Sequence, residues 1–324
     1  MLETLRERQG VVIGVGLMVA ITAILIATGE KESLVIGVIT GAAYGLVALG
    51  LVLIYKSSGV FNFAQGEFGT VAVISLYLLH FDVPYGVALA GALVVAVIFG
   101  LLVERLIIRP LFEAPRVILM VATAGVSLLA IAVEIWFGEA QGKPVAPALT
   151  ALDRVTLLGV QISDQRLLLI GVLALLAILL ALFFNRTNLG LAILGASQEP
   201  TATELVGISV RRLSSFTWAL AALLGGLAGV IAIPEGGSFT PGIVTGSYLI
   251  PAFTAAVLGG MTSLPGAFLG GIIVGVVQAV ATSAPVFNEG GALDIPGTPG
   301  TLMVFVVLLV VLAVRPQGLL GRSA

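Results

Sequence analysis

The polar side chains best placed to recognise a solute fall in one short segment, residues 57–67, which reads SSGVFNFAQGE. Its Asn62, Gln65 and Glu67 carry amide and carboxyl groups that form hydrogen bonds without any covalent step. Two interpretations stay open: the three residues line a polar path, or Asn62 caps the following helix and Glu67 complements its dipole. Together with Tyr44 and Thr254, they are the residues that we expect to line a path for the solute.

Residues suited to catalysis or metal binding are scarce in this chain of 324 residues. Cysteine is absent, which excludes thiol catalysis and Cys-based metal sites, and there is no G-x-S-x-G motif. The single histidine, His80, lies at the edge of an apolar stretch, where an interface residue is expected rather than a metal ligand. We therefore expect no enzymatic activity, no metal site and no cofactor in this chain. The net charge of −2 also argues against binding nucleic acid.

The elements that must position the polar residues are long apolar stretches. Apolar residues make up 59% of the chain and charged residues only 10%, whereas soluble domains carry about 25% charged residues. Runs long enough to cross a bilayer recur almost from end to end. The predicted fold is an all-α polytopic membrane protein with a single domain, residues 1–324. Its ten expected spans are residues 11–28, 34–55, 68–81, 84–103, 117–137, 167–184, 213–233, 248–261, 266–284 and 299–314.

Lysine and arginine residues predict the orientation of these spans, because they collect on the cytoplasmic side. With the N-terminus inside, 11 of the 15 basic residues fall on the cytoplasmic side and 4 on the other. Both termini are then cytoplasmic. The loop at residues 138–165 lies outside, with a possible β-hairpin at 155–162, and the loop at 185–212 lies inside.

Two of the expected spans are short or broken. Residues 68–81 cover only about 21 Å as a helix, less than a hydrocarbon core of about 30 Å. Residues 248–261 are entered through a loop rich in Gly and Pro and left by a Gly-Gly turn. Interrupted segments of this kind are typical of transport sites. Glycines at four-residue spacing indicate close helix packing; they are Gly37, Gly41 and Gly45, Gly225 and Gly229, Gly266 and Gly270, and Gly271 and Gly275.

Two acids outside the first segment need an interpretation. Glu134 lies within an apolar stretch and is by that position a functional candidate. It is close to Trp136, a residue type typical of membrane interfaces, so we expect Glu134 to reach out to the interface. Glu104 precedes Arg105 and Arg109 at an expected span end, where we expect it to be solvated.

A short amphipathic helix is predicted in the cytoplasmic loop, at residues 197–208. Ser197 can cap it, Pro200 suits its first turn and Gly207 suits its end. Ala202, Leu205 and Val206 would form a small apolar edge. Such a helix could bind a cytoplasmic partner or could simply connect two spans.

Three segments carry a resemblance to a known family. Residues 41–67 (GAAYGLVALGLVLIYKSSGVFNFAQGE) and 253–275 (FTAAVLGGMTSLPGAFLGGIIVG) resemble the LivH-type permease of branched-chain amino acid ABC importers. The Ala202-x-x-x-x-Gly207 pattern, followed by ALAALLGGLAG at 219–229, looks like the coupling loop of such permeases, and it departs from the family pattern at Thr203 and Pro200. The resemblance covers the chain from about Gly41 to its end.

The resemblance implies a subunit of the bacterial inner membrane that works with partners. These are a second permease subunit, which the resemblance favours as a different chain, two cytoplasmic ATPases and an extracytoplasmic binding protein. The ATPases would dock on the coupling residues, which are Glu199, Pro200, Ala202, Glu204, Leu205 and Gly207. No Walker A loop occurs in this chain, so ATP and Mg would be bound by the partners.

The solute and the energy source remain open at this stage. Branched-chain amino acids, urea and short amides are all transported by relatives of this kind. An ion-coupled transporter acting alone is the alternative, although it would need buried ionisable relays, for which only Glu134 and Glu67 are available.

Overall fold

The computed structural model describes residues 31–138, 143–145, 155–157, 160–162, 164–236, 238–261, 263–283, 299–314 and 318. This part of the chain is predominantly helical, which confirms the predicted all-α class. The first expected span, residues 11–28, lies outside the described residues.

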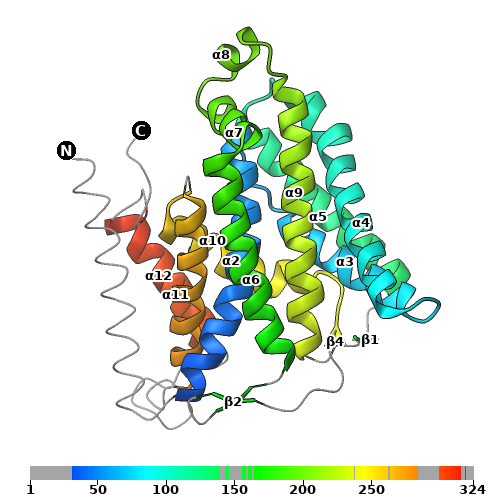
Figure 1. The fold of residues 1–324 in the computed structure, drawn as a ribbon, viewed down its shortest axis with the longest axis vertical. Helices are drawn as coiled ribbons and strands as arrows, with labels where there is room; N and C mark the ends of the chain where they lie inside the picture. Colours follow the sequence, from blue (N-terminus) through cyan, green and yellow to red (C-terminus); the bar gives the residue numbers. More distant parts are fainter. Residues whose placement is uncertain are drawn as a thin grey trace. The chain divides into compact units, whose positions relative to one another are not determined.

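The helices begin and end close to the predicted boundaries (Figure 1). In chain order they are α2 (Lys31–Ser58), α3 (Gln65–His80), α4 (Tyr85–Val103), α5 (Arg116–Gly138), α6 (Asp164–Arg186), α7 (Asn188–Gln198), α8 (Pro200–Leu205), α9 (Val210–Ala232), α10 (Ile250–Gly259), α11 (Leu264–Ser283) and α12 (Pro299–Val314). Shorter turns are the π-helical η1 (Glu104–Ile108) and η4 (Thr245–Leu249) and the 3-10 turns η2 (Arg109–Leu111) and η3 (Ile233–Gly236).

The described strands form two small antiparallel pairs. Strand β1 (Lys143–Pro144) pairs with β4 (Ser238–Phe239). Strand β2 (Val155–Leu157) pairs with β3 (Val160–Ile162), so that Val155 lies opposite Ile162. The hairpin predicted at residues 155–162 is therefore confirmed.

Five helices in the described part of the chain are long and apolar enough to cross a membrane. A sixth is reached if α6 and α7, which meet at an angle of 77°, form one broken span. The segments Thr245–Gly259 and Pro299–Ala313 are apolar but shorter. These helices establish a polytopic membrane protein.

Local sequence accounts for several helix ends. The Thr187 hydroxyl accepts a hydrogen bond from the backbone N–H of Gly190 (3.0 Å) at the start of α7, and Ser209 does the same for Arg212 (3.4 Å) at the start of α9. Helix α2 ends where Gly59 adopts a φ of +66°, a conformation that residues with a Cβ rarely adopt.

Contacts divide the chain into two compact units. Unit 1 consists of Met1–Ala48, Ala151–Leu173 and Ile250–Ala324, and unit 2 consists of Leu49–Thr150 and Ala174–Leu249.

In unit 1, the glycines at four-residue spacing lie at helix crossings. A Cβ on Gly41 would lie 2.7 Å from the Cα of Ile272 in α11, and one on Gly275 would meet the backbone of Gly41. Gly259 and Gly266 approach each other across the turn between α10 and α11, where Gly260 has a φ of +93°. The predicted close packing is confirmed here, because no other residue type allows backbones to come this near.

In unit 2, α3, α4 and α9 pack against one another, and α5 and η4 also contact α3. Gly229 of α9 lies against the backbone of Gly69 in α3. The packed face of α4 is a stripe of small residues at four-residue spacing, whose buried members are Ala88, Ala92, Ala96 and Gly100. Large side chains such as Val94 and Ile98 point outwards.

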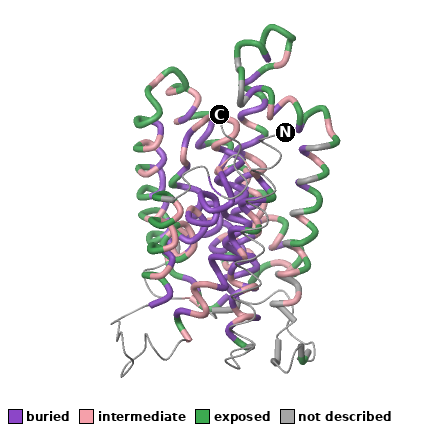
Figure 2. The backbone as a smooth tube through the Cα atoms, turned by 90° about the vertical axis from the view of Figure 1, so that its left-hand side faces the viewer, coloured by how far each residue is buried: buried purple, intermediate pink, exposed green. Residues whose placement is uncertain are grey.

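The arrangement of small residues inside and large apolar residues outside is typical of a helix that faces lipid on one side. Only 28% of the most apolar window of α4 is buried, compared with 83% for α2. Figure 2 shows the same contrast between helices buried along most of their length and helices exposed along one face.

Candidate functional site

The break between α2 and α3 is shorter than predicted. Helix α2 runs on to Ser58, and α3 begins at Gln65, so that only residues 59–64 are non-helical. The Asn62 side-chain oxygen accepts from the backbone N–H of Ala64 (3.0 Å), which turns the chain just before α3. No side chain caps the N-terminus of α3 itself. At 16 residues α3 spans about 24 Å, still short of a full crossing.

The structure brings Asn62, Gln65 and Glu67 together in the core of unit 2, where none of them is more than 1% exposed. The Gln65 amide donates to the backbone carbonyl of Ala221 in α9 (3.0 Å) and accepts from the Asn62 amide (3.4 Å). Gly50 and Gly225 make room for this amide, because a Cβ at either position would lie within 3.1 Å of Gln65 atoms. The two amides thus tie the break to α9.

Glu67 belongs to a second polar group, formed with α5. Its Oε1 accepts from the hydroxyl of Ser127 (2.9 Å). The side chain of Glu134 is a neighbour of Glu67, and its Oε2 accepts from the backbone N–H of Gly242 (2.8 Å). We call Glu67, Ser127, Glu134 and the N–H of Gly242 the carboxyl cluster.

The expectation that Glu134 reaches the membrane interface is wrong, because its side chain is only 4% exposed. Trp136 is 85% exposed and marks the outward face of α5. A residue two positions earlier points about 200° away around the helix, towards the interior. Ser127, seven residues before Glu134, shares its inward face.

Two oxygens of the carboxyl cluster have no hydrogen-bond donor. Within the described part of the chain, these are Oε2 of Glu67 and Oε1 of Glu134. A carboxylate only accepts hydrogen bonds, whereas a protonated carboxyl group also donates one, so a proton on either side chain would allow the two acids to bond to each other.

The cluster also holds the segment between β4 and η4. The Val244 N–H donates to the Thr70 hydroxyl (3.4 Å), two residues after the Gly242 bond to Glu134. Gly242 has a φ of +70° and lies against Ile131 of α5. This segment is thus bound to both α3 and α5. The roles of Ser127, Thr70 and Gly242 were not predicted from the sequence. The seven-residue spacing of Ser127 and Glu134, which places both on one face of a helix, was the one signal that could have pointed to Ser127.

The other two predicted path residues, Tyr44 and Thr254, lie in unit 1. Tyr44 is 4% exposed, and its hydroxyl donates to the side-chain oxygen of Gln278 in α11 (2.6 Å). Thr254 is fully buried and donates to the carbonyl of Ile250 in its own helix (3.0 Å). Gln278 was not predicted, since it sits in an apolar stretch without a motif.

The predicted amphipathic helix is present as α8, in the expected place but shorter. Ser197 does not cap it, because Ser197 lies inside α7 and α8 starts after Glu199. Its end matches the prediction: Gly207 has a φ of +85°, and the N–H groups of Gly207 and Ile208 donate to the carbonyls of Glu204 and Thr203 (2.9 and 3.2 Å). This is a Schellman ending, which requires a left-handed residue.

Most of α8 is open to solvent. Leu205 and Val206 are 83% and 73% exposed, and Glu199, Ala202 and Glu204 are exposed as well. Thr203 is buried, and its hydroxyl donates to the carbonyl of Glu199 (3.0 Å). The apolar pair beside acidic residues has the character of a small docking surface.

Glu104 departs from the expectation of a solvated acid. It is 1% exposed and forms an ion pair with Arg109 (3.1 Å). The reason is the π-helical turn η1, which includes Glu104 and continues α4.

His80 is exposed, as expected of an interface residue, and lines a hollow of about 310 Å³ together with Tyr77 and Tyr85.

Comparison with known proteins agrees with these features. The family described as branched-chain amino acid transport system / permease component matches residues 33–314. The high-affinity branched-chain amino acid transport system permease protein BraD of Pseudomonas aeruginosa is 32% identical over 306 residues, which cover 90% of this chain and 95% of that protein. The permease protein LivH of Escherichia coli, named for the same kind of system, is 28% identical over 302 residues, or 88% of this chain and 94% of LivH.

A solved structure shares the fold. A chain of PsaBC from Streptococcus pneumoniae in complex with Fab matches with a TM-score of 0.50 and 14% identity, over 91% of this chain and 97% of that one. The match to the family model runs through the break before α3, the carboxyl cluster and α8. The chain therefore belongs to the family of permease components of branched-chain amino acid transport systems.

Proposed function

We propose that this protein is the transmembrane permease subunit of an ABC importer for branched-chain amino acids or a related small polar solute such as urea or an amide. The observation that carries the proposal is the family match over residues 33–314, which leaves almost no part of the helical chain unaccounted for. The relatives named for branched-chain amino acid transport align along nearly their whole length as well.

The proposed topology has ten spans with both termini in the cytoplasm of a bacterial-type inner membrane. The distribution of basic residues, 11 against 4, supports this orientation. The short helix α3, preceded by a buried non-helical segment, supports a broken span, because irregular backbone is tolerated at membrane depth only inside protein or beside a wet cavity.

The proposed mechanism is alternating access driven by partner ATPases. Two ATPase subunits would dock on α8 of this chain and of a second, related permease subunit, and an extracytoplasmic binding protein would deliver the solute. The exposed Leu205 and Val206 support α8 as the docking element. Closure of the ATPases would displace α8 and switch the solute path from access on one side to access on the other.

A zwitterionic solute with an apolar tail suits the polar groups proposed for that path. Its charged ends can be met by amides, hydroxyls and helix ends, without a full complement of opposite charges. Asn62, Gln65, Glu67, Tyr44 and Thr254 stay the candidates to line the path, alongside apolar wall residues that would accept the tail.

The test is uptake of labelled leucine into proteoliposomes that contain this chain, its partner permease, the ATPases and the binding protein. We expect accumulation that requires ATP and Mg on the ATPase side, and competition by unlabelled isoleucine and valine. Competition by urea or acetamide instead would change the solute and keep the transporter class. Accumulation by this chain alone would contradict the proposal.

A second function, ion-coupled transport by this chain alone, is favoured by one observation, the buried pair of Glu67 and Glu134. Buried acids in membrane proteins often carry protons or ions. The same vesicles distinguish the two functions: uptake that survives removal of ATP but stops when the ion gradient is collapsed would favour the second.

A further inference from the structure

The end of α4 nearest α8 carries a buried acid, Glu104, with two partly exposed polar partners, Arg109 and Ser215, that the proposed function does not yet use. Helix α4 continues into the π-helical turn η1, where the N–H of Arg109 donates to the carbonyl of Glu104, five residues back. Such turns insert one residue into a helix and are frequent at functional sites. Here the insertion directs Glu104 into the protein, where it is 1% exposed.

Three side chains close a ring of hydrogen bonds at this point. Arg109 donates through Nη2 to Oε2 of Glu104 (3.1 Å) and to the hydroxyl of Ser215 in α9 (2.7 Å). The Ser215 hydroxyl donates in turn to Oε2 of Glu104 (2.9 Å). The ring joins the end of α4 to the second turn of α9.

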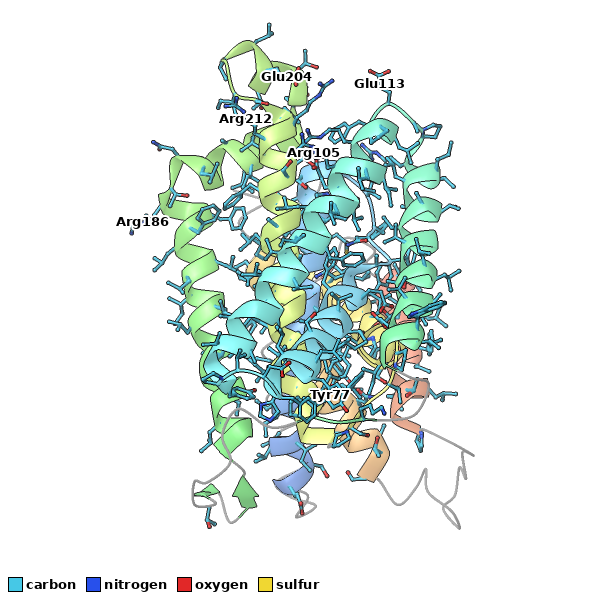
Figure 3. The ribbon with its side chains drawn as sticks, turned by 90° about the vertical axis from the view of Figure 1, so that its right-hand side faces the viewer. Tyr77, Arg105, Glu113, Arg186, Glu204 and Arg212 are labelled. Atoms are coloured by element: carbon cyan, nitrogen blue, oxygen red, sulfur yellow. The ribbon has the colours of Figure 1, made fainter. Side chains whose placement is uncertain are left out.

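Helix α9 is the element that follows α8. The residues between them, 206–209, are held by the two hydrogen bonds of the Schellman ending and by the Ser209 cap of α9. Because this connection is short and held by hydrogen bonds, a displacement of α8 would be transmitted to α9. Figure 3 shows Arg105, the residue after Glu104, at the same end of unit 2 as Arg212 of α9 and Glu204 of α8.

We propose that Glu104, Arg109 and Ser215 form a clasp that transmits movement of α8 through α9 to α4. This rests on the proposed function, because α8 moves only if ATPases act on it. Ser215 and Arg109 are positioning residues: they hold α4 to the moving helix and touch no solute. Helix α4 packs on α3, which carries Glu67, so the clasp leads from the docking helix towards the carboxyl cluster.

The test compares two neighbouring serines of α9 in the complete reconstituted complex. Ser215→Ala removes the hydroxyl from the clasp. Ser214→Ala is the matched control, because Ser214 lies in the same helix and the substitution changes the helix propensity by the same amount. The buried Ser214 hydroxyl has no hydrogen-bond partner within the described residues. The two readouts are ATP hydrolysis and solute taken up per ATP hydrolysed.

We expect Ser215→Ala to lower uptake per ATP by about fivefold, the factor by which losing one ordinary hydrogen bond changes an equilibrium. ATP hydrolysis should continue, and Ser214→Ala should match the wild type. Ser215→Thr, which keeps the hydroxyl, should restore much of the ratio. Arg109→Lys should lower the ratio too, and its effect should be non-additive with that of Ser215→Ala.

An unchanged ratio in Ser215→Ala would overturn the clasp, even if its melting temperature falls, because that outcome would show a purely structural role. The proposed function is tested by the wild-type complex. An absence of ATP-dependent uptake by that complex would refute the proposed function and, with it, the clasp.

Discussion

Replacing Glu134 tests the carboxyl cluster most directly, because two substitutions separate its hydrogen bonds from its charge. Glu134→Ala leaves the buried N–H of Gly242 without its acceptor. An unsatisfied buried donor costs about 1–3 kcal/mol, so we expect the free energy of unfolding to fall by about 2–3 kcal/mol.

Glu134→Gln should be far better tolerated. The amide oxygen can accept from Gly242, and the amide nitrogen can donate to the carboxylate of Glu67, just as a protonated Glu134 would. We expect a change in stability of less than about 1 kcal/mol. The difference between the Ala and Gln variants is the part that comes from hydrogen bonding.

The assay is unfolding by SDS in mixed detergent micelles, followed by tryptophan fluorescence. Trp218 is fully buried in α9 of the same unit and should report the loss of packing, whereas Trp136 is already exposed. Glu113→Ala and Glu113→Gln are the control pair, since Glu113 points into solvent (Figure 3) and should change stability by no more than about 0.5 kcal/mol. Equal losses in Glu134→Ala and Glu134→Gln would refute a cluster held by hydrogen bonds.

Three further predictions test other parts of the structure. Gly207→Val should uncouple ATP hydrolysis from uptake, because a β-branched residue is strained by about 1–2 kcal/mol at a φ of +85°. Gly207→Asn should stay coupled, because asparagine tolerates this conformation. Normal transport by Gly207→Val would disprove the assignment of α8 as the coupling helix. Gly275→Ala should destabilise the protein by about 1–3 kcal/mol in the same SDS assay, because its Cβ would meet the backbone of Gly41. Gly86→Ala should be neutral or stabilising, because there is open space around Gly86. Equal effects of the two substitutions would count against the helix crossing at Gly275. Gln65→Glu should lower the free energy of unfolding by about 1–3 kcal/mol, because a carboxylate would face the carbonyl of Ala221. This loss should be larger than that of Gln65→Leu. A larger loss in Gln65→Leu would show that the Gln65 amide does not donate to Ala221.

The sequence predicted those features that depend on neighbouring residues. The apolar stretches, the hairpin at 155–162 and the left-handed end of α8 at Gly207 all follow from local length, alternation or backbone freedom, and the structure confirms them where it describes them. The glycines at four-residue spacing also indicated where helices touch, because only the absence of a side chain allows that approach. The resemblance to LivH-type permeases was confirmed by the family match.

What the sequence could not predict is which way the polar groups of an apolar helix point. In a soluble helix the polar face marks the surface, but a membrane helix is apolar on both its lipid and its protein face, so the pattern alone did not reveal that Glu134 faces inwards. Its partner at Gly242 is brought in by a segment 108 positions away, and Glu104 is turned inwards by a π-helical turn that has no sequence signature here. The sequence by itself thus determined that this chain is a helical membrane protein with a short helix between two of its apolar stretches. Only the tertiary structure decided that its buried acids are bonded to groups on other segments, Glu67 to Ser127, Glu134 to Gly242 and Glu104 to Ser215, since that depends on contacts between segments distant in the sequence.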